Sequence, residues 1–175
     1  MNSFLFGRFM KNITIIVPAR AGSVGVKNKN LRKIKGRSLI QRAVDLGLRG
    51  NFKVIVTTDI PKPLPVEYKG LVTIYKRPEH LSSHTANMDS VILDLIKTIK
   101  LQGTIILLQP ASPLRTYRQL MEILELYVSS SCTLCISGSR EDNNILKNNI
   151  KLNDKYEPIS SNKYLFSNRQ DLPLV

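Results

Sequence analysis

The segment Pro18–Asn30 combines glycines, a hydroxyl group and positive charge directly after an apolar run. Glycines permit tight turns in which backbone N–H groups approach a ligand, and basic side chains attract anions. The residues with these properties are Gly22, Gly25, Ser23, Arg20, Lys27 and Lys29. This composition suits a polyphosphate, although the segment has neither the Walker A pattern nor G-x-G-x-x-G. A flexible basic loop without a ligand is the alternative interpretation.

Two further polar groups follow later apolar runs. Lys76–Leu81 comes directly after one run, and Leu107–Arg115 begins within the next. In the second group, Gln109 can donate and accept hydrogen bonds toward a sugar or a base, and Ser112 offers a hydroxyl. Each group could instead be only a rigid turn.

Four apolar runs rich in β-branched residues predict buried parallel strands at 13–17, 53–57, 71–75 and 104–108. Apolar residues at helical spacing lie between or after them, at 39–48, 91–99 and 120–127. This order predicts an α/β fold with a doubly wound, mostly parallel, Rossmann-like sheet. Such sheets bind ligands beyond the carboxyl ends of their strands, so we expect the site just after Val17, Thr57 and Leu108.

Two segments depart from the alternation of strand and helix. Ile60–Val66 carries prolines at alternate positions, which exclude a helix and favour an extended crossover. Beyond Ile136 the chain is rich in Ser, Asn, Lys and Asp. We therefore expect residues 1–137 to form the nucleotide-binding α/β domain and residues 138–175 to form a loop-rich excursion, with a hairpin around Asn153 and Asp154.

The composition is that of an ordinary folded chain. Of 175 residues, 42% are apolar and 22% charged, which argues against wholesale disorder. No apolar run reaches the roughly 18 residues of a membrane span, and the first ten residues do not resemble a signal peptide. We expect a soluble protein that works in the cytoplasm without a membrane partner.

The net charge of +13 is concentrated near the start of the chain, where residues 1–50 carry eleven basic side chains and one acidic side chain, Asp45. This local excess predicts an anionic ligand. A nucleic-acid binder is the least favoured alternative, because aromatic residues make up only 6% of the chain and the cations gather on one glycine-bearing loop.

Cys132 and Cys135 have C-x-x-C spacing, which can mark a redox pair or half of a zinc site. They lie in Ser131–Ile136, a short apolar run that predicts a strand, and residues three apart on a strand face opposite sides. We therefore expect both cysteines to fill the core.

Taken in order, several motifs resemble those of the CMP-sialic acid synthetases, the N-acylneuraminate cytidylyltransferases. They are Pro18-Ala-Arg-Ala-Gly-Ser-x-Gly, Lys29-Asn30, Gly36, Thr58-Asp59, Arg77-Pro78 and Leu108-Gln-Pro-x-Ser-Pro-Leu-Arg115. The resemblance extends from about Ile13 to Pro173. It implies a nucleotidyltransferase-type fold and a reaction in which CTP and a nine-carbon 2-keto sugar acid give the CMP-sugar and pyrophosphate, with Mg²⁺. It also implies a homodimer in which a projecting segment, here expected within 138–175, helps to shape the neighbour's sugar pocket.

The resemblance assigns roles to particular residues. The CTP-binding residues would be Ala19, Arg20, Ser23, Asn30, Arg77 and Ala86, with the last two near the cytidine. Catalytic roles would fall to Arg20, Lys29 and Gln109, and substrate contacts to Gln109, Ser112, Lys147 and Arg169. The metal ligands are not identified, and the order of elements offers Asp59 as the one loop carboxylate in a suitable place.

The chain also departs from the family pattern. Val24 stands where the family usually has Lys, His84 where it often has Asp, and Met88 where it often has Ser. The family's later Asp-x-Asp lies beyond Val175, so we expect either a fragment of a longer protein or a reduced form. Two alternatives stay open: a 3-deoxy-manno-octulosonate cytidylyltransferase, and a nucleotide-binding or assembly module without turnover.

Overall fold

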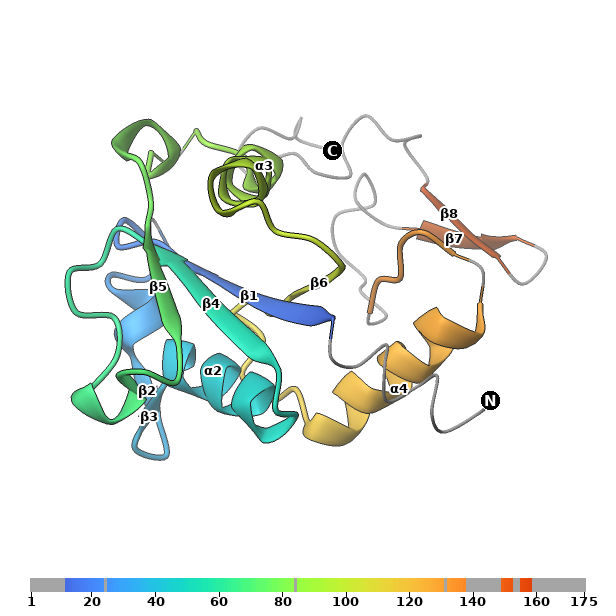
Figure 1. The fold of residues 1–175 in the computed structure, drawn as a ribbon, viewed down its shortest axis with the longest axis horizontal. Helices are drawn as coiled ribbons and strands as arrows, with labels where there is room; N and C mark the ends of the chain where they lie inside the picture. The colour runs from blue at the N-terminus through green and yellow to red at the C-terminus, as the bar shows by residue number, and fades with distance from the viewer. Residues whose placement is uncertain are drawn as a thin grey trace.

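Four parallel strands form the central sheet of the protein. The computed structural model describes residues 12–23, 25–83, 85–130, 132–137, 149–152 and 155–158. The sheet has the order β5-β4-β1-β6 (Figure 1). Its strands are β1 (Ile13–Ala19), β4 (Lys53–Thr58), β5 (Thr73–Lys76) and β6 (Thr104–Leu107). All four predicted strands are confirmed, and β1, which begins with the β-branched run, occupies an inner position, where every one of its residues is buried.

The carboxyl ends of the strands form one edge of the sheet, which we call the carboxyl rim. Ala19 at the end of β1 pairs with Thr58 at the end of β4, which in turn pairs with Lys76 at the end of β5. On the other side of β1, the last pair with β6 joins Ile16 to Leu107. The loops that leave β1, β4, β5 and β6 therefore all start at this rim, as the sequence predicts.

Helices and short elements connect these strands. The α-helices are α2 (Leu39–Arg49), α3 (Met88–Ile99) and α4 (Tyr117–Ser129). The 3₁₀ helices are η1 (Lys29–Leu31), η2 (Val66–Tyr68) and η3 (Glu79–Leu81). Two small antiparallel pairs complete the described elements: β2 (Lys33–Ile34) with β3 (Arg37–Ser38), and β7 (Asn149–Leu152) with β8 (Lys155–Pro158). In the pair β7–β8, Leu152 lies opposite Lys155, which confirms the hairpin predicted around 153–154.

The two faces of the sheet bury different helices (Figure 1). Alternate residues of β1, from Ile13 to Ala19, pack with residues of α2 and α4 in one core cluster. Between them, Ile16 points to the opposite face, where it packs with Ile55 of β4 and Leu95 of α3. This alternation is the period of two expected of a strand covered on both faces. It confirms the predicted doubly wound α/β architecture.

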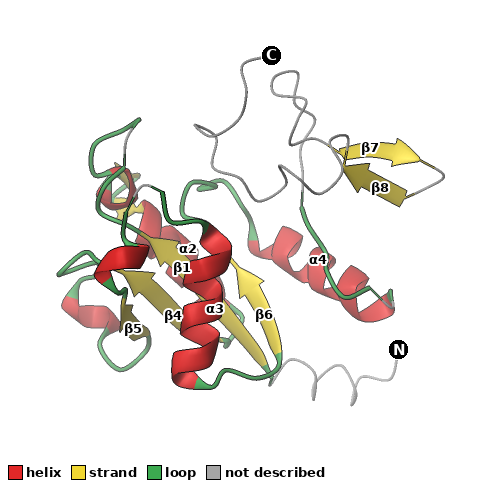
Figure 2. Cartoon of the chain, turned by 90° about the horizontal axis from the view of Figure 1, so that it is seen from above, coloured by secondary structure: helices red, strands yellow, loops and turns green. Residues whose placement is uncertain are grey.

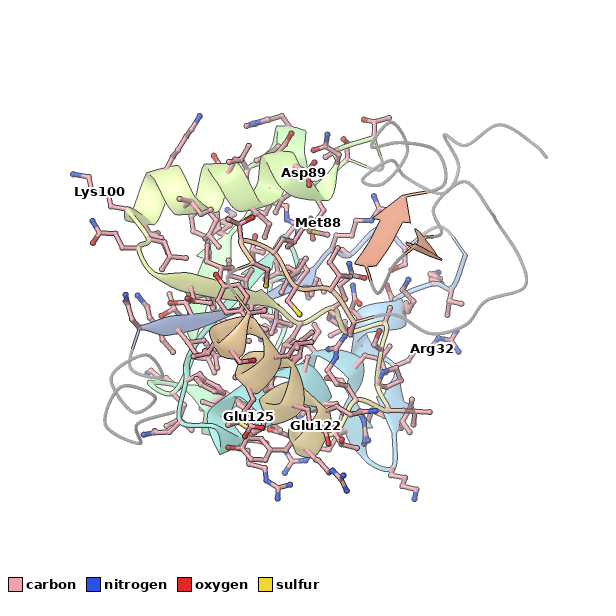
Figure 3. The ribbon with its side chains drawn as sticks, turned by 90° about the vertical axis from the view of Figure 1, so that its right-hand side faces the viewer. Arg32, Met88, Asp89, Lys100, Glu122 and Glu125 are labelled. Carbon is pink, nitrogen blue, oxygen red and sulfur yellow. The ribbon has the colours of Figure 1, made fainter. Side chains whose placement is uncertain are left out.

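Side-chain caps fix the start of each α-helix and so limit the length of the preceding loop. The Ser38 side chain accepts from the Gln41 N–H at the start of α2, and Thr116 accepts from the Gln119 N–H at the start of α4. At α3 the Asn87 side chain accepts from the Ser90 N–H. Figure 3 shows Met88 and Asp89, at the start of α3, and Arg32 toward one end of the molecule, with Lys100 at the other.

The connection from β4 to β5 has no α-helix, as the alternate prolines predict, and contains only η2. It is fastened to α2 through Tyr68, whose hydroxyl donates to Asp45 Oδ1 at 2.6 Å and accepts from Arg37 Nη1 at 3.0 Å. Burial, followed by the hydrogen bond to the Asp45 carboxylate, raises the pKa of Tyr68 to about 12. Tyr68 therefore stays a neutral donor at physiological pH and joins the β2–β3 hairpin, the crossover and α2.

One predicted strand is wrong. Residues 132–137 form no strand in the structure, and the side chains of Leu134 and Ile136 are 61% and 58% exposed. The apolar pattern gives this run strand propensity, but a strand also needs a partner, and these residues pair with no described strand. Cys132 and Cys135 are consequently half-buried and do not fill the core as expected.

The expected division at residue 137 stays a prediction, since residues 138–148 and 159–175 lie outside the described residues. Along the described part of the chain, no helix is both long and apolar enough to cross a bilayer.

Candidate nucleotide-binding site

The loop that leaves β1, which we call the first loop (residues 20–28), is folded back on its own start. Asn30 is buried at 7% exposure, and its Nδ2 donates to the Arg20 carbonyl oxygen at 2.9 Å. Asn28 takes a left-handed backbone conformation with φ of 52° as the chain enters η1. Asn30 therefore joins the end of the first loop to its start.

A second contact fastens the first loop to the neighbouring strand. The Ala21 N–H donates to Asp59 Oδ1 at 2.8 Å, and Asp59 is the first residue after β4. The contact joins residues 38 positions apart in the chain. It holds the start of the first loop at the carboxyl rim, between the ends of β1 and β4.

Arg77, directly after β5, is a buried cation at the same rim. It is only 6% exposed, and its Nη2 donates to the Thr57 carbonyl oxygen at 3.1 Å. Burial lowers the pKa of the Arg77 guanidinium, the Asp59 carboxylate opposes that shift, and the Arg20 guanidinium adds to it. Arg20, Asp59 and Arg77 thus form one electrostatic group, with two positive charges and one negative charge.

Two buried polar atoms at this place have no hydrogen-bond partner among the described residues. They are Arg77 Nε and Thr57 Oγ1. Buried polar atoms without a partner are uncommon and cost free energy. The cationic group therefore keeps an unused donor, Arg77 Nε, directly behind the rim.

Arg20 connects the first loop to the loop that precedes α3. Its Nη1 donates to the Ser83 carbonyl oxygen at 3.0 Å, across 63 positions of sequence. In the same loop, the Ala86 N–H donates to Ser83 Oγ at 3.2 Å. Through Ser83 the structure therefore brings Arg20 close to Ala86, in the loop that leads into α3. Helix α3 itself lies across one face of the sheet (Figure 2).

Gln109 and Ser112 lie on the loop from β6 to α4, on the other side of β1. Both are exposed, and the Ser112 N–H donates to the Gln109 carbonyl oxygen at 3.2 Å in a turn. Arg42 of α2 steadies the loop by donating from Nε to the Pro113 carbonyl oxygen at 3.2 Å. Within the described ranges, no hydrogen bond joins Gln109 or Ser112 to the first loop. The two loops flank the point between β1 and β6 at which the strand order reverses, where doubly wound sheets bind ligands.

The structure thus brings some of the predicted site residues together at the carboxyl rim, whereas Gln109 and Ser112 lie on a separate loop on the other side of β1. Gathered at the ends of β1, β4 and β5 are Ala19, Arg20, Asn30, Asp59 and Arg77, with Ala86 one loop away. Ser23 and Lys29 are half-buried in the first loop and in η1. Lys147 and Arg169, and the family departures at Val24 and His84, lie outside the described residues.

The sequence did not predict the hydrogen bond from Asn30 to Arg20, the hydrogen bond from Ala21 to Asp59, or the burial of Arg77. The order of elements places these residues at one rim, but it does not show which side chain bonds to which backbone group. The one available signal was the position of Thr58-Asp59 and Arg77 directly at the ends of adjacent strands.

The described residues contain no group of three or more His, Cys, Asp and Glu side chains that could hold a metal ion. Asp59 contributes a single carboxylate, one oxygen of which already accepts from Ala21. These residues do not form a resident metal centre. An ion that arrives with a triphosphate needs fewer protein ligands, since Mg²⁺ keeps water and phosphate oxygens in its coordination shell.

The site is not a closed cavity. A cavity of about 190 Å³ lies at the opposite edge of the sheet, lined by residues that include Asn12, Lys53 and Gln102. A shallow depression lies between α2 and the loop from β6 to α4, lined by residues that include Arg42, Ser112 and Arg115. The candidate site is therefore an open, cationic surface built by loops.

A parallel sheet covered by helices on both faces, with a change of strand order between β1 and β6, is a doubly wound α/β fold. Residues 14–175 match the family model described as cytidylyltransferase. The chain belongs to the cytidylyltransferase family.

Individual relatives agree with this assignment. An N-acylneuraminate cytidylyltransferase of Escherichia coli O18:K1:H7 is 28% identical over 140 residues, which cover 77% of this chain and 33% of the relative. The post-translational flagellin modification protein B of Campylobacter coli is 30% identical over 173 residues, covering 94% of this chain and 73% of that protein. The chain therefore spans about a third of the length of the first relative.

Among solved structures, a CMP:2-keto-3-deoxy-manno-octonic acid synthetase complexed with CTP has the same fold. It superimposes with a TM-score of 0.54 at 24% identity, covering 68% of this chain and 48% of that chain. The expected nucleotidyltransferase-type fold is confirmed.

Proposed function

We propose that this chain binds CTP at the carboxyl rim and, within the whole protein, transfers CMP to a nonulosonic acid of the sialic type, releasing pyrophosphate. One observation carries the proposal: the Asp59 carboxylate holds the loop that bears Arg20 at the rim where the buried Arg77 is bound to Thr57, in a member of the cytidylyltransferase family. CTP is a polyanion, and such a group of charges suits it.

The chemistry requires charge and position more than a covalent catalyst. The anomeric hydroxyl of the sugar acid attacks the α-phosphorus of CTP, a new P–O bond forms, and the bond to the β-phosphate oxygen breaks as pyrophosphate leaves. Arg20 and Lys29 would hold the phosphates and stabilise the charge that develops on the leaving group. Gln109 would position the sugar acid or the ribose from the opposite side of β1.

The substrate class rests on relatives. The E. coli relative is named for N-acylneuraminate, and the same substrate type follows from the motif resemblance. The solved structure of similar fold is named for an octulosonic acid, which keeps that sugar acid as the second candidate. Ser112, Lys147 and Arg169 belong to the proposal as substrate contacts.

Three further properties belong to the same proposal and follow from the family resemblance. Mg²⁺ would accompany the triphosphate and keep phosphate oxygens and water in its coordination shell. The whole protein would act as a homodimer to which residues 138–175 contribute, and it would work in the cytoplasm. Light scattering of the purified protein tests the dimer directly.

Pyrophosphate release with CTP and Mg²⁺ tests the proposal, using N-acetylneuraminic, legionaminic and 3-deoxy-manno-octulosonic acids as acceptors. We expect release with an acid of the sialic type. Release with the octulosonic acid alone would move the enzyme to the second substrate class. CTP binding without release from any acceptor would support a nucleotide-binding module, and salt-sensitive duplex binding unaffected by CTP would support a nucleic-acid binder.

A further inference from the structure

Asp59 contacts the first loop and also lies near the guanidinium of Arg77. Its Oδ1 accepts from the Ala21 N–H at 2.8 Å, so it anchors the first loop to the end of β4. The same carboxylate opposes the effect of burial and of Arg20 on the guanidinium of Arg77. One side chain therefore fixes the loop and compensates part of the positive charge beneath it.

The anchor has no substitute among the described contacts of this amide. The Ala21 N–H makes its one described hydrogen bond to Asp59, while the Ala21 carbonyl oxygen accepts from the Ser23 N–H at 2.8 Å and starts the next turn. Loss of the Asp59 acceptor would release the first turn of the loop. Arg20, which immediately precedes Ala21, would move with it.

The negative charge of Asp59 also helps to keep Arg20 in place. Two guanidinium groups near each other repel, and one of them, Arg77, is held beneath the rim at 6% exposure. Without a carboxylate, the exposed Arg20 would be pushed away from Arg77. With Asp59 in place, the side chain of Arg20 stays at the rim, where it donates to the Ser83 carbonyl oxygen.

We propose that Asp59 is a positioning residue for the first loop, which sets Ala21 and Arg20 in the place where the phosphates of CTP bind, and that it does not act as a metal ligand. The inference rests on the proposed function for its ligand, and on the Ala21 and Arg77 contacts for its geometry. The two roles make different demands on the side chain. The hydrogen bond from Ala21 needs only an acceptor oxygen, whereas Mg²⁺ binding depends on the charge of the carboxylate.

Two variants separate these roles. Asp59→Asn keeps an acceptor oxygen for the Ala21 N–H but loses the charge, whereas Asp59→Ala loses both. We expect Asp59→Ala to weaken CTP binding about tenfold, since the part-buried Ala21 N–H loses its partner and the charge is lost as well. Asp59→Asn loses only the charge that opposes the repulsion between Arg20 and Arg77, and should weaken binding by about threefold. Calorimetry with CTP should give the same ratios in Mg²⁺ and in EDTA. Glu122→Ala removes the same charge from α4, where Glu122 pairs with Arg118 of the same helix at 2.8 Å, and should leave affinity unchanged.

Amide hydrogen exchange measured by NMR gives a readout that does not depend on CTP. The Ala21 amide should exchange faster in Asp59→Ala than in the wild type, and at a near wild-type rate in Asp59→Asn. Equal loss of affinity in both variants, seen only with Mg²⁺, would overturn the proposal in favour of a metal ligand. Unchanged affinity and exchange in Asp59→Ala would also overturn it. If the wild type binds no CTP while the exchange pattern appears as expected, the proposed function fails and the anchoring of the loop by Asp59 stands.

Discussion

Replacing Arg20 with alanine should weaken CTP binding by roughly 10- to 100-fold, since hydrogen bonds to charged groups contribute about 1.5–3 kcal/mol. Arg20 is half-exposed, its one described hydrogen bond goes to a carbonyl oxygen in an exposed loop, and the group it forms with Arg77 keeps an excess of positive charge. The melting temperature should change little, because no core contact is lost. Isothermal titration calorimetry with CTP and a thermal melt of each protein measure both quantities.

Lys53→Ala is the matched control for this prediction. Lys53 is an exposed cation at the start of β4, at the edge of the sheet opposite to the carboxyl rim. Its removal lowers the net charge by the same amount, so a general loss of attraction for anions would appear in both variants. Equal losses in Arg20→Ala and Lys53→Ala would mean that Arg20 makes no specific contact with the nucleotide.

The largest expected change in stability concerns the central strand. Ile16 of β1 is fully buried and packs with Ile55 and Leu95, so Ile16→Ala should lower the free energy of unfolding by about 2–5 kcal/mol. Ile74 of the edge strand β5 is 46% exposed, and Ile74→Ala should cost less than about 1 kcal/mol. The two variants delete the same atoms, so the difference between their free energies of unfolding measures the effect of burial.

Urea denaturation followed by circular dichroism measures this difference. A small effect of Ile16→Ala, or an equal effect of both variants, would contradict the strand order β5-β4-β1-β6 on which the position of the site depends. A changed dependence on urea concentration in one variant would mark a change in the unfolded or native ensemble instead.

The framework of the fold could be predicted because it depends on local patterns. The run Ile13–Val17 consists entirely of β-branched residues and carries no charge, which is typical of a strand covered on both faces. The alternate prolines after Asp59 exclude a helix through their fixed backbone geometry, and the structure has none there. The expected edge for the site followed from these elements and from the behaviour of parallel sheets.

Contacts between distant residues could not be predicted in this way. The bond from Ala21 to Asp59 and the bond from Arg20 to Ser83 join different loops, and nothing in local spacing specifies their partners. The short hairpin β2–β3 was missed as well, because each of its strands has only two residues. Its signal was Lys35-Gly36, where both residues have positive φ values of 49° and 78°, as in a tight hairpin turn.

The strand predicted at Ser131–Ile136 shows the opposite error. Its apolar and β-favouring residues satisfied the local pattern, but strand formation depends on a neighbouring edge with free hydrogen-bonding groups. In the described structure the run 132–137 pairs with no strand. Local propensity therefore located the core strands correctly and failed where pairing decides the outcome.

In the mechanism that we propose, the first loop binds the phosphates of CTP. NMR titration of the isotopically labelled protein with CTP tests it most directly, because every backbone amide reports separately. We expect saturable shifts at Arg20, Ser23 and Asn30, with smaller shifts at Ala86 and Gln109 and none in the basic hairpin Lys33–Ser38. Shifts confined to that hairpin, or a spectrum that CTP leaves unchanged, would contradict it.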